Sequence, residues 1–269
     1  MSNVKNIYIN SSPGFRDIGG TSENFTITKT VSPFNMVPKR VKLLSARMPF
    51  VWSNITSANN AFILIENPGP VVHPTTTIAP GHYSGTTLAP ALQNALNTIP
   101  GKLYTYTVTY NTTTFKYTIS ATGLFQLNFA VPDSIAPALG FNETITASSV
   151  SVESPNVAII LPDTEIFVAS NLVGGVDNGV IPYFTGATND LHILAVIPIT
   201  SCYGGVIEYR VSDSEPWLNA SQSAFSMIPN NSSQLTGTDA ILHFSLFFLS
   251  GIPVNLFGAN WSANILLEF

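Results

Sequence analysis

The amino-acid sequence predicts an all-β protein: a single jelly-roll sandwich, discontinuous in sequence, with a small α+β insertion of one helix and one hairpin. Proline and glycine, 19 and 18 of the 269 residues, recur at short intervals along the chain. Between them lie short runs rich in Val, Ile, Phe, Tyr and Thr, a pattern typical of many short strands. These strands flank a single helical segment, so we expect both ends of the chain to build the sandwich.

The first predicted strands precede the helical segment. Phe25–Thr28 alternates apolar and polar side chains, as a strand with one buried face does. Arg40–Leu44, which follows Pro38, is predicted as a second strand, and Ala61–Ile65 as a third. After them the alternating strand pattern is replaced by a helical pattern.

Residues 79–100 contain the predicted helix. Apolar side chains recur there at steps of three and four residues, at Leu88, Leu92, Ala95, Leu96 and Ile99. Ser84 or Thr86 is the expected N-cap, because a hydroxyl side chain accepts a hydrogen bond from the first turn. Pro90 is compatible with a helix only in the first turn, and Pro100 with the glycine after it ends the segment.

A hairpin follows the helix. Tyrosine and valine alternate with threonine in Tyr104–Tyr110, the chain turns at Asn111–Thr114, and the alternation resumes in Phe115–Ile119. Leu124–Phe129 is predicted as another strand and Ser134–Leu139 as a helical turn. Together with the helix, these elements form a small α+β module.

From Val150 onward the pattern again predicts strands alone. The clearest are Asn156–Leu161, Glu165–Ala169, Leu191–Ile199, Gly205–Val211, Ile241–Leu249 and Ala263–Phe269. About nine or ten strands lie outside the insertion, and a jelly roll of two four-stranded sheets needs eight. We therefore expect residues 1–69 and 150–269 to form the jelly-roll domain and residues 70–149 the inserted α+β domain.

Charge is scarce and unevenly placed. Only 9% of the residues are charged, against about a quarter in an ordinary soluble domain, and the net charge is −5. A surface with so few charged side chains favours an assembly subunit, whose surface is covered by partner subunits. Seven of the ten basic residues lie in the first 47 positions: Lys5, Arg16, Lys29, Lys39, Arg40, Lys42 and Arg47. They either face nucleic acid or anionic lipid, or scatter over several strands and merely solvate them.

The sequence shows no catalytic, cofactor-binding or metal-binding residues, and we predict no enzyme. The four histidines have no metal-ligand spacing: His73, His82, His192 and His243. A G-x-S-x-G nucleophile elbow and a phosphate-binding glycine loop are both missing. Cys202 lies in an apolar run and is predicted to be a buried thiol.

Two further groups of residues are candidates for a binding site. Asp213-Ser214-Glu215, which follows Arg210, is predicted either as a solvated loop or as a calcium site or subunit contact. Tyr104 with Tyr106, or Trp217, would serve as an aromatic platform for sugars if the chain were a lectin. The N-terminal segment lacks a signal-peptide pattern and no window is long and apolar enough to span a membrane, so we expect intracellular synthesis.

Several local patterns occur in an order that resembles one family. They are Ala79–Ser84 followed by Leu88, Leu92 and Leu96, then Tyr106–Asn111, Phe115–Ile119 and Ala138–Phe141, with Arg16 and Asn24–Thr26 before them and Gly251–Leu256 and Trp261 after them. This order is similar to that of penton and minor capsid proteins of large double-stranded DNA viruses, virophages and Polinton-like elements. The resemblance touches most of the chain.

The resemblance implies a jelly-roll capsid protein of the virion that forms homopentamers at the fivefold vertices, beside the major capsid protein, without cofactor or small-molecule substrate. The basic N-terminal region would then face the capsid interior, towards DNA, membrane or internal proteins. Two alternatives stay open: a jelly-roll spike or lectin module that binds a receptor or carbohydrate, and a major capsid protein. A major capsid protein of these viruses usually needs two complete jelly rolls, for which the predicted strands are too few.

Overall fold

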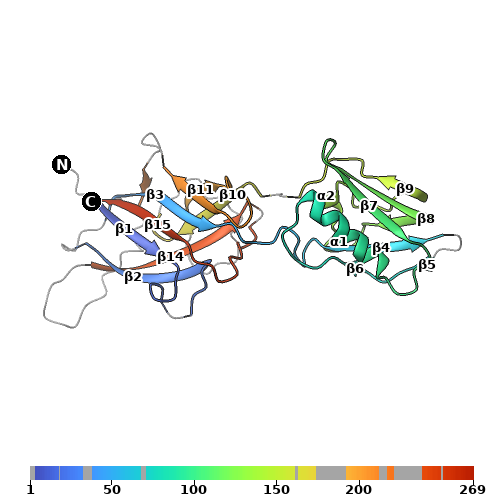
Figure 1. Ribbon diagram of the computed structural model, residues 1–269. Coiled ribbons are helices and arrows are strands. Elements are labelled where there is room, and N and C mark those ends of the chain that lie inside the picture. Colours follow the sequence, from blue (N-terminus) through green and yellow to red (C-terminus); the bar gives the residue numbers. More distant parts are fainter. Residues whose placement is uncertain are drawn as a thin grey trace. The chain divides into compact units, whose positions relative to one another are not determined.

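A computed structural model of the chain describes residues 4–17, 19–32, 38–67, 71–160, 163–173, 192–211, 217–220, 238–249 and 251–269 (Figure 1). The chain forms two compact units. Unit 1 comprises Met1–Trp52 and Asp163–Phe269, and unit 2 comprises Ser53–Pro162. Unit 2 is therefore an insertion into unit 1.

Unit 1 consists of two antiparallel sheets. The strands of the first sheet, in spatial order, are β1 (Val4–Asn10), β15 (Ser262–Glu268), β3 (Arg40–Pro49) and β12 (Val206–Arg210), with the short β13 (Leu218–Asn219) also paired to β3. The strands of the second sheet are β11 (His192–Pro198), β10 (Glu165–Ser170), β14 (Thr238–Phe248) and β2 (Asn24–Ser32).

The order of these strands is that of a jelly roll. With the two-residue β13 set aside, eight strands remain, and one sheet holds the first, eighth, third and sixth of them. The other sheet holds the fifth, fourth, seventh and second, and neighbouring strands are antiparallel throughout. Two four-stranded sheets interleaved in this way form an eight-stranded jelly roll. The predicted single, discontinuous jelly roll is therefore confirmed.

The core of unit 1 contains side chains from both ends of the chain. Alternate residues of β1 and β15 point inward, so that Ile7 and Ile265 are buried. Trp261, which precedes β15, packs against Phe25 of β2 and Phe244 of β14, with ring centroids 5.9 and 6.4 Å away. The indole Nε1–H donates to the carbonyl of Ser22 at 2.8 Å, so the buried ring leaves no polar atom unpaired.

Unit 2 is one sheet covered by a helix. Its strands are β4 (Ala61–Glu66), β5 (Val71–Val72), β6 (Thr76–Thr77), β7 (Tyr106–Asn111), β8 (Lys116–Asn128) and β9 (Ser149–Glu153), and its helices are α1 (Gly85–Asn97) and α2 (Ala136–Leu139). The long β8 pairs with β7 along its first half and with β4 along its second half. Leu88, Leu92 and Leu96 of α1 are buried in the core beneath this sheet.

The sequence around α1 explains where the helix begins. Ser84 is the N-cap: its hydroxyl accepts from the amide of Thr87 at 3.2 Å, and the hydroxyl of Thr87 accepts from the amide of Ser84 at 2.8 Å. The expectation that Pro90 lies in the first turn is wrong, because the helix starts at Gly85. Pro90 is exposed, so its ring meets solvent and the helix loses one hydrogen bond to the carbonyl of Thr86.

Helix α1 also protects the outer edge of β7. The side-chain amide of Asn97 donates to the carbonyl of Tyr106 at 2.7 Å and accepts from its amide at 3.0 Å. Gln93 Oε1 accepts from the amide of Val108 at 3.0 Å. Backbone groups that another strand would otherwise pair are thus bonded to helix side chains.

Gly140 has a conformational reason to be glycine. It ends α2 with a φ of +76°, in the left-handed region that glycine adopts without strain. A Cβ at this position would also lie 2.3 Å from the carbonyl oxygen of Asn156. The Ala138–Phe141 pattern therefore marks a helix end with a close backbone approach.

Most predicted strands are present, with shifted ends. Five strands were not predicted: β1, β9, and the two-residue strands β5, β6 and β13. The predicted strand Asn156–Leu161 is wrong, because residues 156–160 are irregular and bond to the β7–β8 turn at Phe115 and to helix α2 at Pro137. Leu161 lies outside the described residues.

The two units divide the chain at positions that differ from the predicted domain ends at 69/70 and 149/150. Residues 53–69 and 150–162 belong to unit 2, because β4 and β9 both pair with β8. The sequence of an apolar strand such as β4 does not predict which of two sheets the strand joins.

Phe115 is expected to be replaceable with a gain in stability. It closes the β7–β8 turn with a φ of 57°, which costs a side-chain-bearing residue about 1 kcal/mol, and its ring is 54% exposed. Phe115→Gly should therefore stabilise unit 2 by about 0.5–1 kcal/mol in chemical denaturation. Phe115→Ala is the control, because it removes the ring and keeps the strain. An equal gain in both variants would contradict the explanation.

Candidate interaction surfaces

The outward side of the first sheet of unit 1 gathers basic residues. On β3 the inward side chains are buried: Val41, Leu43, Ala46 and Met48. The alternate positions Arg40, Lys42 and Arg47 therefore lie on the outward side, and Arg210 of β12 joins them because it pairs with Ser45. We call the outward side of this sheet the basic face.

Net charge differs between the basic face and the remainder of the chain. Among the described residues, the face holds four of the ten basic residues and two of the eleven acidic residues, Glu208 and Glu268. The net charge of the described face is therefore +2, and that of the other described residues is −3. Of the basic residues in the N-terminal region, three gather here, whereas Arg16 and Lys29 lie on other elements.

Arg40 and Arg47 form ion pairs within the sheet, and Lys42 is buried. Arg40 Nε lies 2.5 Å from Glu268 Oε2, and the Arg40 guanidinium sits over the ring of Trp217, 5.7 Å from its centroid. Arg47 pairs with Glu208 at 3.0 Å, and both side chains are more than half exposed, so this pair contributes at most about 1 kcal/mol. The two pairs neutralise much of the charge at opposite ends of β3.

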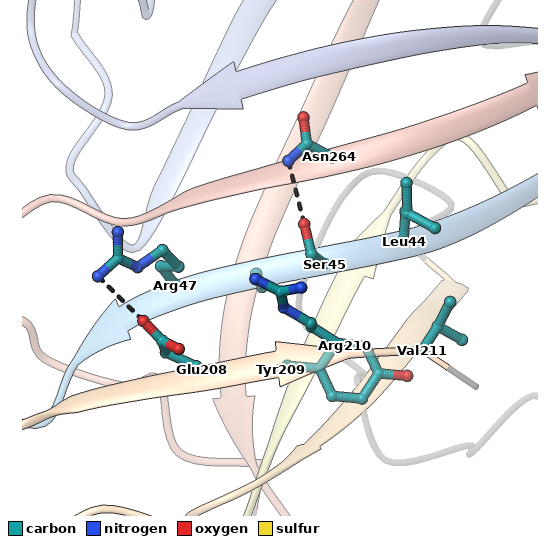
Figure 2. Close-up of a pocket in the computed structure, with 9 residues that line it drawn as sticks. Leu44, Ser45, Arg47, Glu208, Tyr209, Arg210, Val211 and Asn264 are labelled. Atoms are coloured by element: carbon teal, nitrogen blue, oxygen red, sulfur yellow. Dashed lines mark hydrogen bonds and ion pairs between the residues drawn. The ribbon is translucent and has the colours of Figure 1, made fainter.

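A hollow of about 510 Å³ lies where β3 meets β12 (Figure 2). It is lined by Leu44, Ser45, Ala46, Arg47, Glu208, Tyr209, Arg210, Val211 and Asn264. Asn264 donates to the hydroxyl of Ser45 at 3.0 Å. Arg210 makes no hydrogen bond or ion pair with the rest of the described chain. The hollow thus combines one guanidinium, unpaired within the described chain, with the polar side chains of Ser45 and Asn264 and with three aliphatic side chains, Leu44, Ala46 and Val211.

Tyr104 and Tyr106 do not form the aromatic platform that a lectin would use, because Tyr106 is buried. Tyr106 is 1% exposed and donates its hydroxyl proton to Glu66 at 2.6 Å, and the Tyr104 hydroxyl donates to the carbonyl of Asn67. Trp217 is covered on one face by Arg40. The acidic segment Asp213–Glu215 lies outside the described residues.

The histidines lie in separate surroundings. His73 is buried beside Glu66, whereas His243 Nε2 lies 2.6 Å from Asn24 Oδ1, and burial lowers the pKa of His243. Within the described ranges, no three His, Cys, Asp or Glu side chains gather to hold a metal ion. Neither described helix is long and apolar enough to cross a membrane.

Cys202 is exposed, so the prediction of a buried thiol is wrong. Its apolar neighbours in the sequence belong to β11 and β12, and Cys202 lies in the turn between these strands. The amides of Gly204 and Gly205 donate to the carbonyls of Phe50 and Cys202, and this turn geometry holds the thiol at the surface.

Glu66 anchors a polar network that sequence reasoning missed. Its carboxylate is fully buried at the end of β4 and accepts four hydrogen bonds, from His73 Nε2, the Tyr106 hydroxyl and the amides of Leu103 and Tyr104, at 2.6–3.0 Å. Burial raises the pKa of Glu66, but these four hydrogen bonds outweigh it and hold the pKa below its ordinary value. Glu66 thereby joins the end of β4 to the loop that leads into β7.

Comparison with known proteins gives a result at the level of fold. No protein family and no curated protein matches the chain in sequence. Among solved structures, the mavirus penton protein matches with a TM-score of 0.55 and 12% identity, over 100% of this chain and 99% of that one. A chain of the Sputnik virophage structure matches with a TM-score of 0.45 and 14% identity, over 99% and 97%. The likeness to the mavirus protein confirms the predicted fold along the whole chain.

Glu66→Gln is expected to destabilise unit 2 by about 2–4 kcal/mol, because the amide group would turn a donor towards donors in a buried site. All three tryptophans lie in unit 1 and five of the nine tyrosines in unit 2. Unfolding of unit 2 in the variant should therefore change the tyrosine near-ultraviolet circular dichroism at a lower denaturant concentration than the tryptophan fluorescence. Glu153→Gln, at an exposed carboxylate, is the control and should change stability by less than about 0.5 kcal/mol.

The same network sets a dependence on pH. The folded-state pKa of Glu66 lies below the unfolded value of 4.5, so its stabilisation is complete above pH 4.5 and is lost as the pH falls through the folded-state pKa. Glu66→Gln should remove this part of the acid dependence of unit 2. An unchanged acid transition in the variant would show that other groups control it.

Proposed function

We propose that this chain is a structural capsid protein: the penton, five copies of which form each fivefold vertex of an icosahedral double-stranded DNA virus or virophage. The single observation that carries the proposal is the likeness to the mavirus penton protein over the whole length of both chains. A jelly roll interrupted by a second unit between β3 and β10 accounts for every described element. The proposed location is the capsid of the virion, beside the major capsid protein.

The low charge of the chain supports this role. A subunit that neighbours cover on several sides needs few charges to stay in solution, and only 9% of these residues are charged. A fivefold ring is held by heterologous contacts, in which one face of a subunit meets a different face of the next. The structural role requires neither a cofactor nor a catalytic residue.

The two rival functions have less support. A major capsid protein with two jelly rolls would need a second sandwich, but unit 2 is one sheet with a helix against it. A lectin or spike module lacks the aromatic platform expected for it, because Tyr106 is buried in the core of unit 2.

The purified chain, at 28.8 kDa per copy, is expected to form pentamers, alone or together with the major capsid protein. Native mass spectrometry gives the stoichiometry and negative-stain imaging shows whether the particles are fivefold rings. A trimer would favour a spike or lectin module. A stable monomer that never joins a shell would contradict the penton role.

We also propose that basic residues of the N-terminal region contact the capsid interior: DNA, membrane or internal proteins. Lys39 is the exposed candidate, whereas Arg40 is engaged with Glu268 and Trp217. Reversing the charge of Lys39 and Arg40 together should lower genome retention in assembled particles, measured as packaged nucleic acid per capsid. Lys39→Arg with Arg40→Lys, which keeps both charges at the same positions, is the control and should retain the genome as wild type does. Unchanged assembly and retention in the charge-reversed variant would overturn the interior contact.

A further inference from the structure

Arg210 is an exposed cation without a partner in the described structure. It lies on β12, the strand at the edge of the first sheet, and borders the hollow between β3 and β12 (Figure 2). The neighbouring cation Arg47 is already paired with Glu208. A guanidinium presents a rigid fork of donors that matches a carboxylate in a bidentate pair. The unpaired charge of the basic face is therefore located at this hollow.

The surroundings of Arg210 have the composition of a protein interface. Residues Tyr8, Asn264, Ser45 and Arg210 lie in one row across four strands, in the registers of β1 with β15, β15 with β3 and β3 with β12. Leu44, which lines the hollow, is 36% exposed, and Tyr8, at the far end of the row, is 48% exposed. Tyrosine and arginine beside exposed aliphatic side chains are the residue types enriched where protein partners bind tightly.

Charge distinguishes a protein partner from nucleic acid. A phosphate backbone presents about one negative charge per 1.7 Å of duplex and favours cations that are free of carboxylates. On the basic face Glu268 and Glu208 neutralise Arg40 and Arg47, and the net charge is only +2. A surface that offers one free guanidinium among apolar and neutral polar groups fits a protein segment with a single carboxylate better.

The complementary charge is present on the chain itself. Outside the basic face the described residues carry a net charge of −3, so a second copy has a surplus of carboxylates to offer. We infer that the hollow at β3 and β12 is where a second copy of this chain docks, with a carboxylate of that copy bound by Arg210 and its apolar neighbours against Leu44 and Val211. This inference rests on the proposed penton function, and it assigns the basic face to the contact between adjacent subunits of the ring.

The test compares subunit association in Arg210→Glu, Tyr8→Ala and wild type by mass photometry over a range of concentrations. Arg210→Glu should weaken association by about tenfold or more, because it places two carboxylates together at the contact. Tyr8→Ala should weaken it less, and added salt should weaken wild type but not Arg210→Glu. Arg16→Glu makes the same change of charge off the basic face and should associate as wild type does. If Arg210→Glu does not fold, Arg210→Gln removes the cation at an exposed position without adding charge.

The outcomes separate this inference from the proposed function. Normal pentamers from both Arg210→Glu and Tyr8→Ala would overturn the inference and leave the penton role intact. An Arg210→Glu variant that forms pentamers but no longer binds nucleic acid would overturn the inference, and nucleic acid would be the partner of the hollow. One that forms pentamers but no longer assembles beside the major capsid protein would overturn it as well, and the major capsid protein would be the partner. A wild-type chain that neither forms pentamers nor enters a shell would overturn the penton role, and the inference with it.

Discussion

The pairing of the chain's two ends is the constraint on which the jelly roll depends. In one sheet β1 lies against β15, and in the other β2 lies against β14. Trp261 connects the two sheets, because its ring packs on Phe25 and Phe244 while its backbone amide bonds to Ser11. The middle of the chain is not needed for these contacts. The connection between β3 and β10 can therefore hold a whole second unit, since the entropy of closing a loop rises only slowly with its length.

Around the apolar core of unit 2, irregular segments are fixed by neutral polar side chains and by the buried carboxylate of Glu66. Asn54 bonds to the backbone of Tyr83 in both directions and to the carbonyl of Ile160, which ties the beginning and the end of the unit to its centre. Glu66 does the same for β4 and the loop before β7. These bonds explain how a chain with so few charges keeps irregular segments in place: buried backbone groups are paired by amide side chains and by one fully satisfied carboxylate.

The sequence pattern predicted the elements whose structure depends on neighbouring residues. It failed for side chains whose surroundings are set by residues far away in the sequence. The periodicity of Leu88, Leu92 and Leu96 predicted α1, because those positions share a helix face whatever surrounds them. The donors to Glu66 lie 37–40 residues away along the chain except for His73, so its sequence neighbourhood carries no sign of them. Arg210 meets Ser45 only through the strand order of the jelly roll. Cys202 was mistaken for a core residue because apolar composition does not distinguish a strand from the turn that follows it.

The amide side chains along β7 have a consequence for how copies of unit 2 behave towards one another. An unprotected strand edge is a template for intermolecular β-sheet growth, and crowding many identical edges in a small space favours aggregation. Asn97 and Gln93 occupy the donors and acceptor of Tyr106 and Val108 that such growth would use. Helix α1 therefore blocks amyloid-like stacking at this part of the β7 edge, beside an exposed threonine-rich hairpin.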